Sequence, residues 1–217
     1  KNLTSVGSNA LRNCSALDTI VWNVKTFSIT SSSSTPFNAS NVSVYSQIKS
    51  FTFGPDVETI PNYLCYNMSK INTTIIPSSV TSIGTNAFYG CTSNKSVINH
   101  SALDVVKGST THGYVAYYAS DVYAGNDTVG DFVFAKKDGK DYAVRYLGND
   151  CQITLPANYR GGSYGIGANL FRDNTIANSI TISNAVTSIG DYAFNGCSNL
   201  NVVYIGNSVL SIGASAF

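Results

Sequence analysis

The sequence predicts a β-rich solenoid of stacked repeats, interrupted by an inserted β-hairpin meander. Residues 178–197 (NSITISNAVTSIGDYAFNGC) and 201–217 (NVVYIGNSVLSIGASAF) align without a gap at an offset of 23 residues. An Ile-Gly pair and an Ala-Phe pair recur in both segments, and apolar residues alternate before them. A fixed period of about 20–29 residues is typical of leucine-rich repeats. We therefore expect an α/β, β-rich leucine-rich-repeat solenoid, a right-handed superhelix of ~23-residue repeats.

The repeat unit can be written C-x-x-L-x-x-V-x-I-P-x-S-V-x-S-I-G-x-x-A-F-x-G-C. The V-x-I alternation predicts a strand too short to bury its apolar face alone, so it must stack on the same strand of the next repeat. The Ile-Gly pair predicts a bend in which glycine adopts a backbone conformation that other residues avoid. The x-x-Ala-Phe stretch favours one tight helical turn whose phenylalanine fills the core.

The N-terminal repeats are predicted in residues 1–100. The motif is recognisable in 5–17 (SVGSNALRNCSAL), and a Ser/Thr-rich loop then interrupts it over 27–45, within which Phe37 takes the phenylalanine place. The pattern returns at Ile48 and is complete in 71–91.

Residues 101–150 are predicted to hold a divergent repeat and the inserted meander. In 112–120 (HGYVAYYAS) a short helical turn would place Ala116-Tyr117 at the Ala-Phe position. Two strand-like runs flank an Asp-Gly pair within 131–147, which is a strong hairpin signal. We expect Cys151–Leu155 to add a third strand. Residues 151–217 then carry the C-terminal repeats of one continuous solenoid.

The composition excludes several function classes. Charged residues make up 12% of the 217-residue chain, and the net charge of +1 gives no electrostatic basis for binding nucleic acid or anionic lipid. No apolar run approaches the ~20 residues of a transmembrane segment. The five cysteines include no C-x-x-C pair, which argues against a disulfide framework or a zinc site. Three of them share one place in the repeat, and all five are expected to be small buried residues: Cys14, Cys65, Cys91, Cys151 and Cys197.

The sequence contains no pattern typical of a catalytic, cofactor or metal site. His100 and His112 have no acidic partner at motif spacing, and the aspartates around the predicted hairpin do not match a calcium loop. Ser163 does not lie in a nucleophile elbow. We therefore expect no enzyme and no cofactor.

Two candidate binding surfaces follow from the pattern. Strand residues next to the inward ones should face outward and form a concave face for a protein partner. The alternative explanation for these residues is that Thr and Val are simply good strand formers. These predicted outward residues are Thr19, Val21, Ser50, Thr52, Thr73, Ile75, Ser179, Thr181, Val202 and Tyr204. The alternative is an aromatic patch that stacks on sugars or proteins, or that packs beneath the meander: Tyr114, Tyr117, Tyr118 and Tyr123.

The units SVTSIGTNAFYGC (79–91) and AVTSIGDYAFNGC (185–197) resemble the BspA-like class of leucine-rich repeats. The resemblance covers roughly residues 1–100 and 151–217, and segments 50–65 and 153–167 are similar to versions in surface proteins of the gut Bacteroides type. It implies export, display on the cell surface, and adhesion to or binding of host proteins, without catalytic residues.

We therefore expect a non-catalytic extracellular or cell-surface module that binds a host or extracellular protein. A carbohydrate-binding module using the tyrosine patch, with glycans as partners, is one alternative, and a passive surface spacer is the other. Both ends of the sequence fall inside a motif, so we expect a piece of a longer protein or a solenoid without its own caps.

Overall fold

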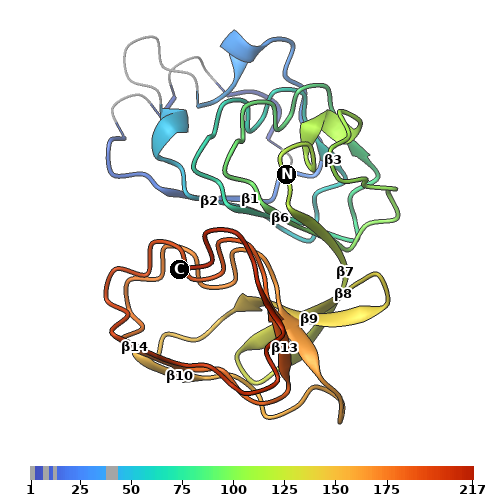
Figure 1. Cartoon of the computed structure of the whole chain (residues 1–217). Helices are drawn as coiled ribbons and strands as arrows, with labels where there is room; N and C mark the ends of the chain where they lie inside the picture. Colours follow the sequence, from blue (N-terminus) through green and yellow to red (C-terminus); the bar gives the residue numbers. More distant parts are fainter. Residues whose placement is uncertain (1–2, 7–9, 12–13, 38–43) are drawn as a thin grey trace. The chain divides into compact units, whose positions relative to one another are not determined.

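The computed structural model describes residues 3–6, 10–11, 14–37 and 44–217, and divides the chain into two units (Figure 1). Unit 1 comprises Lys1–Val122 and unit 2 comprises Tyr123–Phe217. Each unit stacks short parallel strands in two rows, joined by tight turns. The predicted solenoid of ~23-residue repeats is confirmed. The three regions predicted from the sequence remain a prediction.

In unit 1, the V-x-I stretches form a first row of strands. They are β1 (Thr19–Trp22), β2 (Ser50–Phe53), β4 (Thr73–Ile76) and β6 (Ser96–Asn99). Pairs β1–β2 and β4–β6 run parallel and match residue for residue, so that equivalent repeat positions lie side by side. The residues before the glycine place form a second parallel pair, β3 (Thr59–Ile60) and β5 (Ser82–Ile83).

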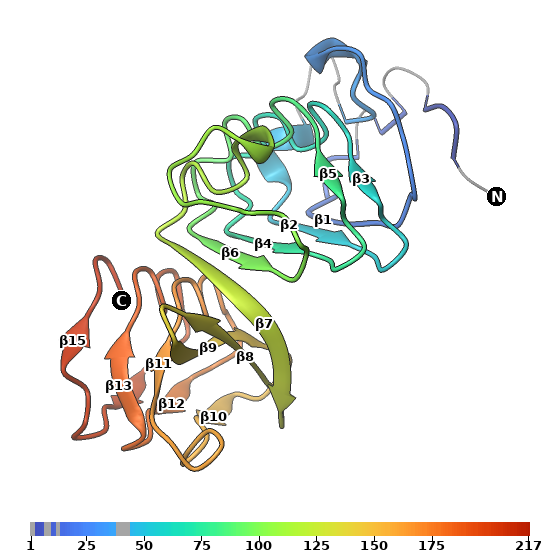
Figure 2. The ribbon, with the colours of Figure 1, turned by 90° about the vertical axis from the view of Figure 1, so that its right-hand side faces the viewer.

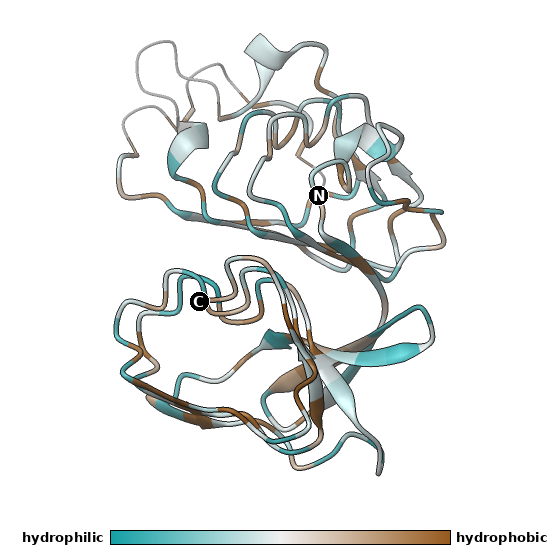
Figure 3. Cartoon of the chain, viewed as in Figure 1, coloured by the Kyte–Doolittle hydropathy of each residue, from teal (hydrophilic) through white to brown (hydrophobic). Residues whose placement is uncertain are grey.

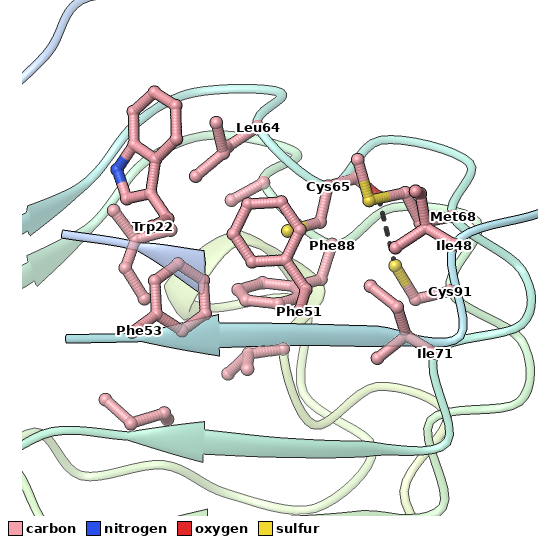
Figure 4. Packing of buried hydrophobic residues seen from close by; sticks show 14 of the residues in the cluster. Trp22, Ile48, Phe51, Phe53, Leu64, Cys65, Met68, Ile71, Phe88 and Cys91 are labelled. Atoms are coloured by element: carbon pink, nitrogen blue, oxygen red, sulfur yellow. Dashed lines mark hydrogen bonds between the residues drawn. The ribbon is translucent and has the colours of Figure 1, made fainter. Parts of the chain in front are cut away.

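Short 3-10 turns connect the strands of unit 1: η1 (Ser32–Ser34), η2 (Val44–Gln47) and η3 (His112–Tyr114). The core between the two rows is aromatic, and Figure 4 shows Phe53 and Phe88 inside it. Phe37 is buried against Trp22 and Phe51, as expected for a core phenylalanine.

Unit 2 repeats the two-row arrangement (Figure 2). The first row is β10 (Gln152–Thr154), β12 (Ser179–Thr181) and β14 (Val202–Tyr204), and the second is β11 (Tyr164–Ile166), β13 (Val186–Ile189) and β15 (Ser211–Ile212). Phe171, Phe194 and Phe217 stack in one column, with centroid separations of 5.4 and 4.9 Å and interplanar angles of 13° and 11°. Equivalent phenylalanines therefore superpose from repeat to repeat.

The hairpin is confirmed as β8 (Phe132–Lys137) and β9 (Lys140–Tyr146). Asp138 and Gly139 both have positive φ, 49° and 74°, which suits a two-residue hairpin turn. In Figure 3 the charged tip of this hairpin is hydrophilic, whereas the strands of unit 2 contain many apolar residues.

The third strand of the meander was predicted wrongly. Cys151–Leu155 contains β10, which pairs with β12 in the first row rather than with the hairpin. The third strand is instead β7 (Asp121–Val129), which precedes the hairpin and pairs antiparallel with β8. Its sequence, DVYAGNDTV, is polar and interrupted by Gly125, and its register shifts between Ala124 and Asp127, so the period of a strand is lost.

The glycines of the Ile-Gly pairs are required for a different reason than the one predicted. Gly84, Gly190 and Gly213 do not have left-handed backbone, but a Cβ on any of them would overlap atoms of the preceding repeat. For Gly213, a Cβ would lie 2.6 Å from the backbone nitrogen of Asp191. Glycine is therefore needed at this place because the coils approach closely.

Side-chain oxygens link consecutive repeats next to these glycines. The amide of Thr85 donates to Asn62 Oδ1 at 2.8 Å, and the amide of Ala214 donates to Asp191 Oδ1 at 2.9 Å. Donor and acceptor are 23 residues apart in both cases. Each bond gives a hydrogen-bond acceptor to a backbone amide at a bend, where no neighbouring strand offers a carbonyl.

The divergent turn near residue 112 is present but shifted. The carbonyl of Gly113 accepts from Phe88 N at 2.7 Å, just as the carbonyl of Ala87 accepts from Cys65 N. Gly113 thus takes the alanine place predicted for Ala116, and Tyr117 is 43% exposed instead of filling the core. His112, with a φ of 50°, takes the left-handed place that Asn86 and Tyr192 hold just before their alanines.

The cysteines divide into two groups. Cys91 Sγ donates to the Cys65 carbonyl at 3.1 Å, and Cys197 Sγ donates to the Phe171 carbonyl at 3.0 Å. The thiol therefore hydrogen-bonds the phenylalanine-place carbonyl one repeat earlier. Figure 4 shows Cys65 and Cys91 within the unit 1 core. Burial raises the pKa of the Cys91 thiol to about 12 and also raises the pKa of Cys65. Cys197 is only partly buried, and two cysteines contradict the prediction of burial, since both are exposed: Cys14 and Cys151.

Candidate functional site

The outward-facing strand residues of unit 1 form aligned rows. Thr19 pairs with Ser50 and Val21 with Thr52, so that like positions of β1 and β2 are neighbours. Along β2, Phe51 and Phe53 are buried while the two residues between and before them remain partly exposed. Val21 is 71% exposed. Predicted residues Thr73 and Ile75 continue the pattern in β4, where Thr74 and Ile76 are buried.

The first row of unit 2 presents a similar surface. Thr181 lies between Thr154 and Tyr204 in the paired register, and Ser179 lies beside Val202. Tyr204 is 62% exposed and Val202 is 41% exposed. The structure therefore brings the predicted residues of each unit to one face of that unit's first row.

Sequence reasoning missed the contribution of β10 to this face. Gln152 and Thr154 are exposed and align with Ser179 and Thr181. The signal was present, because ITLP at 153–156 has the same pattern as ITIS at 180–183. The sequence places residues 151–217 in the C-terminal repeats, but the expected pairing of 151–155 with the meander left Gln152 and Thr154 out of the predicted face.

We call these outward positions the first-row face of each unit. The residues at these positions carry hydroxyl, amide, aliphatic and phenolic groups, and none carries a charge. The face can therefore offer hydrogen bonds and apolar contact.

A second surface is a continuous row of tyrosine rings in unit 1. Ring centroids of consecutive members lie 5.8, 5.4, 5.2, 5.3 and 4.9 Å apart. Most pairs meet edge to face, and Tyr66 and Tyr89 stack at 15°. The members of this tyrosine row are Tyr63, Tyr66, Tyr89, Tyr114, Tyr117 and Tyr118.

The structure thus adds Tyr63, Tyr66 and Tyr89 to the predicted patch and removes Tyr123 from it. Tyr123 is 1% exposed, and its hydroxyl accepts from Ala168 N at 3.0 Å, so its ring cannot meet a ligand. Tyr66 and Tyr89 are 23 residues apart and occupy the same repeat position, a signal the sequence did contain. Tyr63 and Tyr114 have positive φ, 56° and 68°, which costs an aromatic residue about 1–2 kcal/mol.

The described residues contain no group of three or more His, Cys, Asp or Glu side chains placed to hold a metal ion. None of the helices described is both long and apolar enough to cross a membrane.

The family model for the BspA type leucine rich repeat region matches this chain in six copies, over residues 1–95, 43–136 and 150–217. The chain belongs to the BspA-type leucine-rich-repeat family. A similar solved structure is a leucine rich cell surface protein from Faecalibacterium prausnitzii A2-165, with 20% identity and a TM-score of 0.42. The match covers 96% of this BspA-type chain and 47% of that one, so the chain spans about half the length of the similar structure. Comparison with curated protein sequences gave no match.

Proposed function

We propose that the chain is a non-catalytic binding module, displayed outside the cell or on its surface, that holds an extracellular protein on its first-row face. Membership of the BspA-type family supports a surface interaction module. The observation that carries the proposal is the alignment of partly exposed, uncharged side chains in both units, as in the Thr154, Thr181 and Tyr204 register.

Such a face suits protein binding on physical grounds. Short Ser, Thr and Val side chains lose little rotamer freedom on contact, and the parallel ladders beneath them hold their spacing. The interface core of protein complexes is depleted in charge and enriched in tyrosine. Tyr204 is the exposed aromatic residue of this face in unit 2 and is its expected anchor.

The test is attachment to immobilised extracellular-matrix proteins, first identified by pull-down and mass spectrometry from the wild type. We expect Tyr204→Glu and Thr181→Glu to weaken attachment by about tenfold or more, because each buries an unpaired charge in the contact. Thr73→Glu and Ile75→Glu test the corresponding face of unit 1. Circular dichroism and thermal melting report whether the variants fold.

Thr128→Glu is the matched control, because Thr128 is an exposed strand residue of β7 outside the first row. It should bind like the wild type. If the face variants fold and attach normally, the first-row face is not the binding surface.

A second candidate is carbohydrate binding by the tyrosine row. The specific observation in its favour is the unbroken run of ring contacts, which includes the exposed rings of Tyr89 and Tyr117. Tyr117→Ala with Tyr118→Ala should then abolish signal on a glycan array. A chain that binds neither matrix protein nor glycan would be a passive spacer.

A further inference from the structure

Unit 2 has a groove of about 640 Å³ on the outer side of its second strand row. The groove runs across β9, β11, β13 and β15, on the side away from the inward residues Ile166 and Ile189. Its volume is within the range of about 300–1,000 Å³ that is usual for small-ligand sites. Figure 2 shows the strands β15, β13 and β11 that contribute to it.

The floor of the groove is a row of four paired residues. Tyr142 pairs with Gly165, Gly165 with Ser188, and Ser188 with Ser211. All four line the groove. The inserted hairpin supplies the tyrosine at one end of this row, and successive repeats supply the other members.

Gly165 is a departure from the repeat, and it makes room for Tyr142. The same repeat position holds serine in Ser82, Ser188 and Ser211. A Cβ on Gly165 would lie 2.5 Å from Tyr142 Cδ1 and 2.7 Å from Ser188 Oγ. The tyrosine ring therefore lies over the bare backbone of Gly165, in space that a serine would occupy. The back of the ring is supported by Tyr123, at a centroid distance of 5.5 Å.

The remaining lining is mostly polar and nearly balanced in charge, and its apolar members are the exposed Leu210 and the buried Tyr164. Hydroxyls come from Ser163 and Thr187 as well as from the floor, and the rim carries Lys140 and Asp141. The Asp141 carboxylate accepts from Lys136 Nζ at 2.7 Å, which holds it in place. The groove thus offers many short hydrogen-bonding groups beside the ring of Tyr142 and the side chain of Leu210.

We propose that this groove is a binding site for a neutral saccharide chain. The C–H groups of a sugar ring carry slight positive charge and are attracted to the negative face of an aromatic ring. Sugar hydroxyls both donate and accept, which matches serine and threonine hydroxyls and a carboxylate. An apolar ligand would leave these groups unpaired, and a strongly charged ligand would find no net opposite charge. The site is independent of the first-row face and adds a second kind of partner.

The experiment uses the whole chain on a printed array of neutral and acidic oligosaccharides, followed by calorimetry with the soluble form of each neutral oligosaccharide bound. We expect Tyr142→Ala to weaken binding by about tenfold or more, since a buried aromatic anchor is lost. Tyr142→Phe keeps the ring and should retain most of the affinity. Gly165→Ser restores the repeat residue, displaces the ring and should act like Tyr142→Ala.

A second substitution avoids the core altogether. Ser211 is exposed at one end of the floor, so Ser211→Glu places bulk and charge in the groove and should also abolish binding. Ser82→Glu is its matched control, because Ser82 is exposed at the same repeat position in unit 1. It should leave binding unchanged.

Three results would overturn the proposal. The first is no array signal from a folded wild type. The second is binding that survives Tyr142→Ala and Ser211→Glu. The third is binding lost with Tyr117→Ala and Tyr118→Ala but kept in the groove variants, which would assign the sugar to the tyrosine row. Attachment to matrix protein, measured on the same variants, reports separately on the first-row face.

Discussion

Replacing Gly190 with alanine should destabilise unit 2 by about 2 kcal/mol. A Cβ on Gly190 would lie 2.6 Å from Ala168 N, 2.8 Å from the Gly167 carbonyl carbon and 2.9 Å from Ile166 O. All three are backbone atoms of the preceding repeat, so no side chain can rotate to relieve the overlap. Overpacking costs about 1–3 kcal/mol, and overlap with fixed backbone atoms puts this cost near the upper end. The smaller conformational entropy of the unfolded alanine chain offsets about 0.4–1 kcal/mol of it, which leaves about 2 kcal/mol.

The assay is urea unfolding followed by circular dichroism. With a denaturant slope of about 1–3 kcal/mol/M, a loss of about 2 kcal/mol lowers the midpoint by about 1 M. Gly162→Ala is the control, because its Cβ would meet only Tyr159 O at 3.6 Å and its backbone is not left-handed. It should unfold within about 0.5 kcal/mol of the wild type. Equal midpoints for Gly190→Ala and Gly162→Ala would refute the close approach of successive coils.

Two further predictions concern titratable side chains. In native protein at pH 8, iodoacetamide should label the exposed Cys14 and Cys151, whereas Cys65 and Cys91 should react only after unfolding, because they are buried. Mass spectrometry of the digested protein measures the extent of labelling at each cysteine. Fast labelling of Cys91 in the native protein would contradict its buried thiol hydrogen bond. Burial raises the pKa of Tyr164 to about 12, above the unfolded value of about 10. The stability that depends on its protonated form is therefore present below about pH 10 and lost as pH rises towards 12. Tyr164→Phe should make the urea midpoint less dependent on pH in that window, and an unchanged slope would count against a buried phenol.

The repeat could be predicted from the sequence because every coil must meet the same packing requirement. The phenylalanines at 171, 194 and 217 recur at one interval since each must stack on the last, and the ring column in unit 2 follows directly. The alternation that marks Thr181 as outward has the same origin, because Ile180 and Ile182 on either side of it are buried in the core.

Features that belong to one coil alone could not be read in this way. Strand β7 is polar, bulged and unlike any repeat, and it is a strand because β8 supplies its partner. The shifted turn depends on Gly113 packing against Ala87, a contact that the motif does not encode. From its sequence, Tyr123 could lie either in the exposed aromatic patch or beneath the meander. The motif does not encode the hydrogen bond that buries it, which its hydroxyl accepts from a residue 45 positions away.

The amide-to-oxygen bonds between consecutive coils all point in one direction, from a donor amide in the later coil to an acceptor oxygen in the earlier one. This direction governs which duplications of the chain the solenoid can accept. The acceptor oxygen of Asp191 and the donor amide of Ala214 occupy equivalent places, one coil apart. A copied segment of one period therefore carries its own acceptor for the coil that follows and its own donor for the coil before. Tandem duplication of such a segment should be tolerated in register. Extra residues elsewhere in a coil are also accommodated, since Asp56 N donates to Asn23 Oδ1 across a spacing of 33 residues.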